Sequence, residues 1–289
     1  MPRSRLAPWL LLAPAIGVLA IFTGYPLVQS VPLSMKQTFG PGATTWVGLE
    51  NFAAALGDPI FHKAVINTVL FMIGSVCTQI PAALGLALLL NHPSIRGRAV
   101  LRLLFFSPQL VGLVFVAVLT RIAFEKSTGI VNTGLHAVLP MWSLEFPWLE
   151  KHVLATLVLA SFWMWTGFHM VFFLAALQNV PKELHEAASI DGAGPVRRFW
   201  VVTMPAILPI ASFVTMLSVL GSLQLFELPY VVFAGGGPEN RGLTIVTYLY
   251  QTGFESGDLG YSSAIGWLLA IMLLFCSIIM LLAGRARHA

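Results

Sequence analysis

Residues 152–181, HVLATLVLASFWMWTGFHMVFFLAALQNVP, contain no aspartate, glutamate, lysine or arginine and lie between Lys151 and Lys182. A helix needs about 20 mostly apolar residues to cross the hydrocarbon core of a bilayer. The stretch is long enough, and it predicts a membrane-spanning helix over residues 153–177. It therefore indicates a helical integral membrane protein.

Five further intervals between charged residues have the same character, although the third is barely long enough to span. They predict helices over residues 8–33, 64–90, 103–121, 201–226 and 261–283. The chain has 57% hydrophobic and 10% charged residues, whereas a soluble domain has about 25% charged residues. We therefore expect a single all-α transmembrane domain over residues 1–289, with about six helices and membrane lipid around much of its surface.

The positions of the basic residues predict the orientation. With the N-terminus in the cytoplasm, ten of the 16 lysines and arginines fall inside, among them Arg3, Arg5 and Arg287. Cytoplasmic loops of membrane proteins carry such an excess of lysine and arginine, so we expect both termini inside. The net charge of +4 is thus a sign of topology, and no nucleic-acid partner is expected.

The cytoplasmic loop over residues 179–199, NVPKELHEAASIDGAGPVRRF, follows the span quoted first. We predict two short helices with a break. Asn179 can cap the first helix, Pro181 suits its first turn, and Asp191 with Gly192 forms a turn. Gly194 and the following proline open the second helix. A short helix that exposes small residues and a carboxylate suits insertion into a groove of a partner protein.

The run E-A-A-x-x-D-G-A at residues 186–193 resembles the EAA loop of permease subunits of ATP-binding-cassette importers. Glu-Ala-Ala alone is a good helix-forming triplet and Asp-Gly alone a turn, so the combination and its place between two spans carry the resemblance. The stretches 226–230 (FELPY) and 235–238 (GGGP) are similar to those of sugar permeases. The N-terminal part resembles the "first" permease of maltose and glycerol-3-phosphate importers.

The resemblance implies a type I importer permease fold in a bacterial inner membrane. It implies a permease subunit that translocates a sugar or oligosaccharide delivered by an extracellular or periplasmic solute-binding protein. The implied partners are a cytoplasmic ATPase dimer and a second homologous permease. The chain has no G-x-x-x-x-G-K-[ST], H-E-x-x-H or G-x-S-x-G sequence, so we expect no catalytic residue, metal site or cofactor here, with ATP and magnesium held by the ATPase.

The resemblance also implies that the loop docks into a cleft of the ATPase. We expect Ala187 and Ala188 to permit close approach, Glu186 to fix the loop through hydrogen bonds or an ion pair with Arg197 or Arg198, and Asp191 to cap the second helix. The alternative for Glu186 and Asp191 is a solvated loop charge. The complete predicted coupling site is Glu186, Ala187, Ala188, Asp191, Gly192, Ala193 and Gly194.

Polar and aromatic side chains within the spans are the candidates for the substrate path, because such groups usually face the protein interior. Trp165 and His169 are four residues apart on one helix face, and Gln224 and Glu227 are three apart. Aromatic faces and amides suit sugars. The alternative is ordinary contact between helices. We assign that packing role to Gln79 and Gln109, and interfacial anchoring to Trp142 and Trp148.

Three rival functions remain open. An importer of glycerol-3-phosphate or a polyol would use the same machinery, but a phosphate favours a basic residue in the path, and the spans offer only Arg121 near a boundary. A membrane enzyme would need paired acids, histidines or cysteines at one depth. A channel would not explain the EAA-like loop. For an importer, the outer loops 36–63, 121–152 and 233–260 would meet the binding protein.

Overall fold

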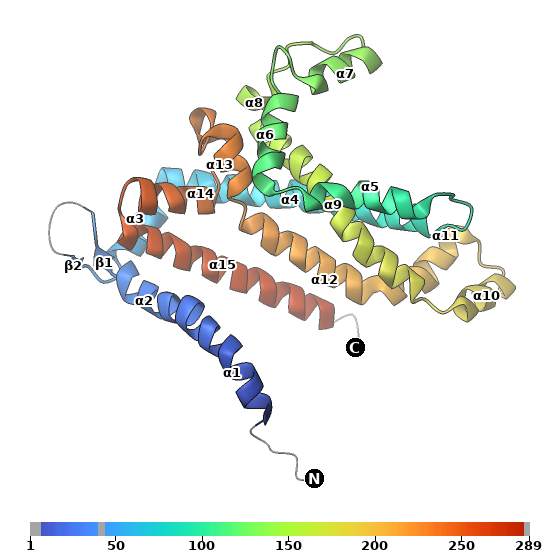
Figure 1. Cartoon of the computed structure of the whole chain (residues 1–289), viewed down its shortest axis with the longest axis horizontal. Helices are drawn as coiled ribbons and strands as arrows, with labels where there is room; N and C mark the ends of the chain where they lie inside the picture. Colours follow the sequence, from blue (N-terminus) through green and yellow to red (C-terminus); the bar gives the residue numbers. More distant parts are fainter. Residues whose placement is uncertain (1–6, 40–43, 286–289) are drawn as a thin grey trace. The chain divides into compact units, whose positions relative to one another are not determined.

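The computed structural model describes residues 7–39 and 44–285 and is nearly all helical (Figure 1). Arg3, Arg5 and Arg287, which contributed to the predicted orientation, lie outside the described residues. Among the described residues, five helices are long and apolar enough to cross a membrane, and a bent helix pair would make a sixth. The five are Trp9–Ser34, Pro59–Asn91, Val153–Gln178, Pro195–Leu223 and Leu259–Leu282. The expected all-α membrane fold is confirmed.

The third expected span differs from a single straight helix. Its residues form α5 (Arg98–Leu110) and α6 (Leu113–Ala123), which meet at an angle of 97°. Val111 and Gly112 between them have extended backbone angles, with ψ of 133° and 143°. Pro108 in the last turn of α5 also removes a backbone donor. The helix therefore ends there, although the hydropathy of the segment continues without interruption.

The described chain forms two compact units, of which the first comprises residues up to 59 together with 249–270. Its elements are α1 (Ala7–Leu19), η1 (Ala20–Gly24), α2 (Tyr25–Ser34), β1 (Lys36–Gln37), β2 (Thr45–Trp46), α3 (Glu50–Gly57), η4 (Gln251–Glu255) and the start of α15 (Leu259–Arg285). The two strands are antiparallel, with Lys36 opposite Trp46. Thr38 ties them to the later segment, donating to Asp258 Oδ1 (3.1 Å) and accepting the Gly260 N–H (2.7 Å).

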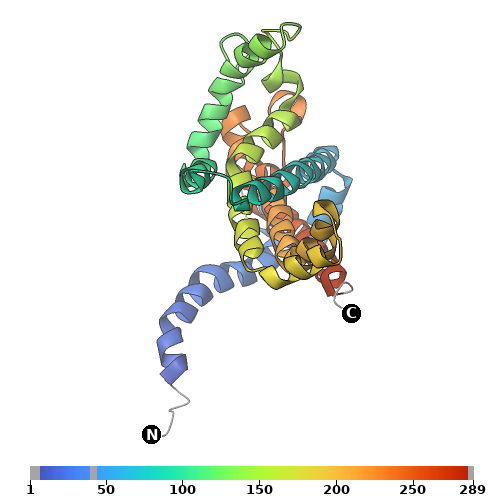
Figure 2. The same ribbon diagram turned by 90° about the vertical axis from the view of Figure 1, so that its right-hand side faces the viewer.

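The second unit comprises residues 60–248 and those from 271 onward. Its remaining elements are α4 (Pro59–Asn91), α7 (Ile130–Val138), α8 (Trp148–Lys151), α9 (Val153–Gln178), α10 (Lys182–Ile190), α11 (Pro195–Arg198), η2 (Phe199–Thr203), α12 (Met204–Leu223), α13 (Glu227–Phe233), η3 (Pro238–Asn240) and α14 (Ile245–Tyr250). Helix α9 is central, packing against α5, α6, α8 and α12. Helix α7, between α6 and α8, lies apart from α4 and from most of α9 (Figures 1 and 2).

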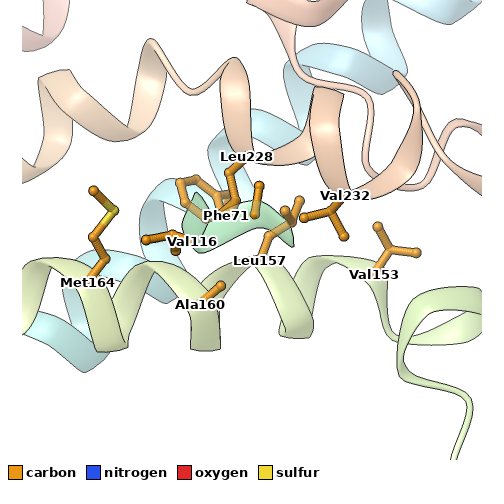
Figure 3. Close-up of a cluster of buried hydrophobic side chains, with 9 residues drawn as sticks. Phe71, Val116, Val153, Leu157, Ala160, Met164, Leu228 and Val232 are labelled. Atoms are coloured by element: carbon orange, nitrogen blue, oxygen red, sulfur yellow. The ribbon is translucent and has the colours of Figure 1, made fainter. Parts of the chain in front are cut away.

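Two buried apolar clusters hold α9 in place. In the first, Phe71 of α4, Val116 of α6 and Leu228 of α13 meet Leu157 and Met164 of α9 (Figure 3). The second lies nearer the other end of α9, where Met170, Phe173, Leu174 and Leu177 meet α4 and α12. The expected packing role of Gln79 is confirmed, since its Nε2 donates to Ser161 Oγ (2.9 Å) between α4 and α9.

Gly167 allows α9 to touch the main chain of α5. A Cβ atom at this position would lie 1.8 Å from the Phe105 carbonyl oxygen. Small residues at helix crossings let backbones approach closely in membrane proteins. The crossing of α5 and α9 therefore depends on the absence of a side chain at Gly167.

Candidate functional site

The loop after α9 folds as two short helices with a break, α10 and α11, as the sequence predicts. Pro181 is the N-cap residue of α10 with an extended backbone, and Glu183 lies in the first turn, where a negative charge is favourable. The predicted cap by Asn179 is wrong. Its Nδ2 donates backward to the Ala175 carbonyl oxygen (3.0 Å), so this residue ends α9.

The turn between the two helices requires Gly192. This residue has a φ of +76°, which favours glycine because it has no Cβ. The Gly192 N–H donates to the Ser189 carbonyl (3.1 Å) and the Ala193 N–H to the Ala188 carbonyl (2.9 Å). This is the Schellman pattern that ends many helices. The predicted turn at Gly192 is therefore confirmed by the backbone geometry, and its part in coupling stays a prediction.

Asp191 does not cap the second helix as predicted. It is the C-cap residue of α10, and the N-cap of α11 is Gly194, whose backbone is extended. Gly194 can serve there without a side chain because the following residue, Pro195, has no N–H that needs a partner. The Asp191 carboxylate is exposed beside the turn.

The predicted coupling residues divide into an exposed set and a packed set. Glu186 and Ala187 are exposed on α10, whereas Ala188 is only 9% exposed. Ala193 is half-buried. Ala188 therefore faces the protein's own interior, and its small size serves the packing of α10 and not a docking surface, contrary to expectation. Both ends of this segment join the long helices α9 and α12 (Figure 2).

Glu186 forms no ion pair with Arg197 or Arg198 in the described structure, and the internal pairing predicted for it is wrong. Its carboxylate is exposed, and the apolar side chains of Leu184, Ile190 and Val196 are 49%, 86% and 74% exposed on the same loop. A charged group beside uncovered apolar residues is the composition of a protein contact surface.

The structure brings Trp165 and His169 together on α9. Their ring centroids lie 6.4 Å apart with an interplanar angle of 24°. Trp165 is half-buried, and His169 is 2% exposed. His169 Nδ1 has no hydrogen-bond partner among the described residues. This pair thus offers an aromatic face and an unpaired polar atom within a span.

Gln224 and Glu227 lie at the junction of α12 and α13, and both are exposed. Gln224 Nε2 donates to the Leu220 carbonyl oxygen (3.1 Å), and Glu227 opens α13. Their neighbour Leu225 and Trp165 both pack against the first buried cluster. The two predicted pairs therefore border one common cluster, but no hydrogen bond joins them among the described residues. Their part in a substrate path stays a prediction.

The loop between α6 and α9 has a polar core that the sequence analysis missed. Trp148 is 9% exposed, and its Nε1 donates to Asn132 Oδ1 (2.8 Å). Asn132 Nδ2 donates to the carbonyl oxygens of Lys126 and Phe146, both at 3.1 Å. Trp148 is thus a buried packing residue and not an interfacial anchor. No local sequence pattern marks Asn132, because its three partners are set by tertiary contact.

Comparison with known proteins decides the family. Residues 79–286 match the family described as "Binding-protein-dependent transport system inner membrane component".

The chain belongs to this family.

Two curated relatives cover nearly the whole sequence. The arabinooligosaccharides transport system permease protein AraP of Halalkalibacterium halodurans is 36% identical over 95% of this chain and 86% of the relative. The lactose transport system permease protein LacF of Rhizobium radiobacter is 34% identical over 96% of this chain and 94% of the relative. This chain is therefore a multi-pass membrane component of a transport system and not an enzyme.

A solved structure supports the fold. A chain from the crystal structure of a bacterial ABC transporter involved in the import of the acidic polysaccharide alginate superimposes with a TM-score of 0.82. It is 24% identical, and the match covers 96% of each chain. The likeness shows that this protein has the fold of an importer permease.

Proposed function

We propose that this chain is one of two permease subunits of an ATP-driven importer that moves a neutral sugar or oligosaccharide across a bacterial inner membrane. The observation that carries the proposal is the α10–α11 loop. Its Gly192 turn presents Glu186, Ala187 and exposed apolar side chains away from the body of the unit. Such a loop suits the cleft of an ATPase subunit that transmits the energy of nucleotide hydrolysis.

The proposed partners are an ATPase dimer, a solute-binding protein and a second permease. Its sequence has no phosphate-binding glycine loop, so we assign ATP and magnesium to a dimer of separate ATPase subunits. A solute-binding protein would deliver the substrate from outside, and the family's description as binding-protein-dependent supports this. The second permease would complete the path, of which this chain supplies one wall.

The relatives and the spans favour a carbohydrate as cargo. The two relatives described above are named for arabinooligosaccharides and lactose. Neither α9 nor α12 contains a lysine or arginine, and α9 offers the Trp165 ring. A sugar stacks its C–H surface on an aromatic face and needs no cation, whereas glycerol-3-phosphate would require compensation of its charge.

The test is the ATPase activity of the assembled complex in lipid, with the binding protein and sugar as stimulant. We expect Glu186→Ala to reduce stimulation at least about tenfold if its carboxylate docks in the ATPase cleft, as loss of one charged contact predicts. Arg96→Gln, which removes an exposed charge from the cytoplasmic loop between α4 and α5 and leaves the coupling loop intact, is the control and retains stimulation. Normal coupling in Glu186→Ala, or failure of any ATPase subunit to co-purify, would contradict the proposal.

A further inference from the structure

A cavity of about 300 Å³ lies at the start of α9 and is rich in basic side chains. It is lined by Lys63 and Asn67 of α4, Lys151 at the end of α8, the first turn of α9 and Arg241 after η3. We call it the Arg241 pocket. All of these residues belong to the second compact unit.

The pocket is at the opposite end of α9 from the coupling loop. Helix α9 has 26 residues, and at 1.5 Å per residue it is about 39 Å long, enough to cross a bilayer. Since the coupling loop follows the last turn of α9 and is cytoplasmic, the pocket opens on the outer face of the membrane.

The charges in the pocket do not balance. The pocket holds the cations of Lys63, Lys151 and Arg241, and within the described residues the acidic side chain in contact with them is that of Glu239. Its Oε2 accepts from Arg241 Nη2 (2.7 Å) and Nε (3.1 Å). The hydrogen bond and the charge of Arg241 hold the pKa of the Glu239 carboxyl below its usual value. One ionised carboxylate thus faces three cations, and the pocket keeps a positive excess.

The loop that carries Arg241 is held in an unfavourable backbone conformation. Glu239 and Asn240 have φ of 52° and 56°, values that L-residues other than glycine seldom adopt. The side chain of Asn67, 6% exposed, donates to the carbonyl oxygens of Asn240 (2.8 Å) and Leu243 (3.0 Å). Lys63 Nζ donates to the Glu239 carbonyl. Strained conformations persist where the surrounding structure fixes them, and they cluster at functional sites.

We propose that the Arg241 pocket receives an acidic side chain of the extracellular solute-binding protein, and that this carboxylate replaces Glu239 as the partner of Arg241. The proposal rests on the proposed function and names the contact by which that partner docks. The side chains of Arg241 and Glu239 are 41% and 72% exposed, so the ion pair is accessible and weak enough to exchange.

A protein carboxylate fits the pocket better than an acidic cargo does. Beyond the pocket, α9 and α12 carry no lysine or arginine. An anion that moved inward would therefore leave the positive charges that neutralise it, at a high free-energy cost. A docked side chain stays at the outer face. Charge complementarity at an exposed site raises association rates and selects the partner.

The experiment measures the dissociation constant of the binding protein, identified by its stimulation of ATPase activity, for the complete transporter in lipid nanodiscs. We expect Arg241→Gln and Lys151→Gln each to weaken binding about 5- to 20-fold and to reduce its salt dependence. Glu239→Gln removes the internal competitor and tightens binding about threefold. Arg96→Gln, which removes an exposed cation from the loop between α4 and α5 at the cytoplasmic face, is the control. Co-elution of the ATPase subunits in size-exclusion chromatography verifies assembly of each variant.

Each outcome decides the proposal. Weaker binding in both cation variants together with tighter binding in Glu239→Gln supports it. Equal binding by Arg241→Gln, Lys151→Gln and the intact protein overturns it. A raised transport KM for an oligogalacturonate probe in Arg241→Gln, at unchanged affinity for the binding protein, also overturns it and assigns the pocket to an acidic cargo. If the intact complex binds no such protein, the proposed function itself fails.

Discussion

The contact between Gly167 and α5 gives a prediction that can be worked out from atomic positions. In Gly167→Ala the new Cβ would lie 1.8 Å from the Phe105 carbonyl oxygen, whereas contacts under 3.0 Å are essentially never seen. The two main chains must therefore separate by about 1.2 Å, the difference between these distances. Because the obstacle is a backbone atom in the middle of a packed helix, no side-chain rotation can relieve it.

The expected cost follows from the energetics of overpacking. Extra atoms forced into a well-packed interior cost about 1–3 kcal/mol, and for a chain of this size each kcal/mol lowers the melting temperature by about 2–4 °C. Gly167→Ala should thus lower the melting temperature of the purified complex by about 2–12 °C in differential scanning fluorimetry. Gly85→Ala in α4 is the matched control. It also adds a methyl group to a long apolar helix, but nothing lies within 4 Å of the added atom.

The control variant, Gly85→Ala, should change the melting temperature in the opposite direction or leave it unchanged. Alanine is a better helix former than glycine by about 1 kcal/mol, so Gly85→Ala should melt at the wild-type temperature or above it. A second variant tests the identity of the obstacle. Adding Phe105→Ala should not rescue Gly167→Ala, because the clash involves the carbonyl and not the ring. Unchanged stability of Gly167→Ala, or full rescue by Phe105→Ala, would refute the reasoning.

Three further predictions concern the loops. In Gly192→Ala the alanine is forced to a φ of +76°, which should destabilise the turn by about 1 kcal/mol. This variant should therefore reduce ATPase coupling more than Gly194→Ala, because the φ of −66° at Gly194 suits any residue. Equal loss of coupling in both variants would contradict this. Asn132→Ala leaves the Trp148 donor and two carbonyl oxygens without their hydrogen-bond partner. Hydrogen exchange of residues 124–152 should therefore accelerate, consistent with about 1–3 kcal/mol of local destabilisation. Unchanged exchange would show that these bonds do not hold the loop. Hydrogen bonds from Thr128, foremost its backbone N–H, and from Ser127 lower the pKa of the Glu125 carboxyl to about 2. A lowered folded-state pKa stabilises the turn above the unfolded value near 4.5, and this stabilisation is lost as pH falls toward 2. The hydrogen-exchange protection of residues 125–129, relative to the unfolded-chain rate at each pH, should therefore fall over that window, and Glu125→Gln should flatten the fall.

The coupling loop shows how far local sequence rules extend. Two helices and a glycine turn were predictable, because a positive φ at Gly192 and a proline at the start of α11 are local backbone requirements. The partners of Asn179, Glu186 and Asp191 were predicted wrongly. Each side chain could satisfy a local pattern, and the actual path of the backbone selected a different partner or solvent.

By itself, the sequence determined the membrane class, most of the apolar segments and the resemblance to importer permeases, and it predicted the orientation. These properties follow from the free energy of burying apolar residues in lipid and from the positions of charges along the chain, both of which are additive over short segments. The family match and the helical fold confirm the membrane class and the resemblance, and the orientation stays a prediction. Gly167 could have been suspected of a close helix contact from its place among large side chains, although not its partner.

Only the tertiary structure decided the 97° bend between α5 and α6, the contact of Gly167 with Phe105, and the pocket formed by Lys63, Lys151 and Arg241. The three cations are far apart in the sequence and share no motif. They come together because α4, the start of α9 and the loop after η3 pack at one end of the same unit, with Asn67 holding that loop in a conformation it would not adopt alone. Such sites depend on long-range packing, and patterns of a few neighbouring residues do not predict them.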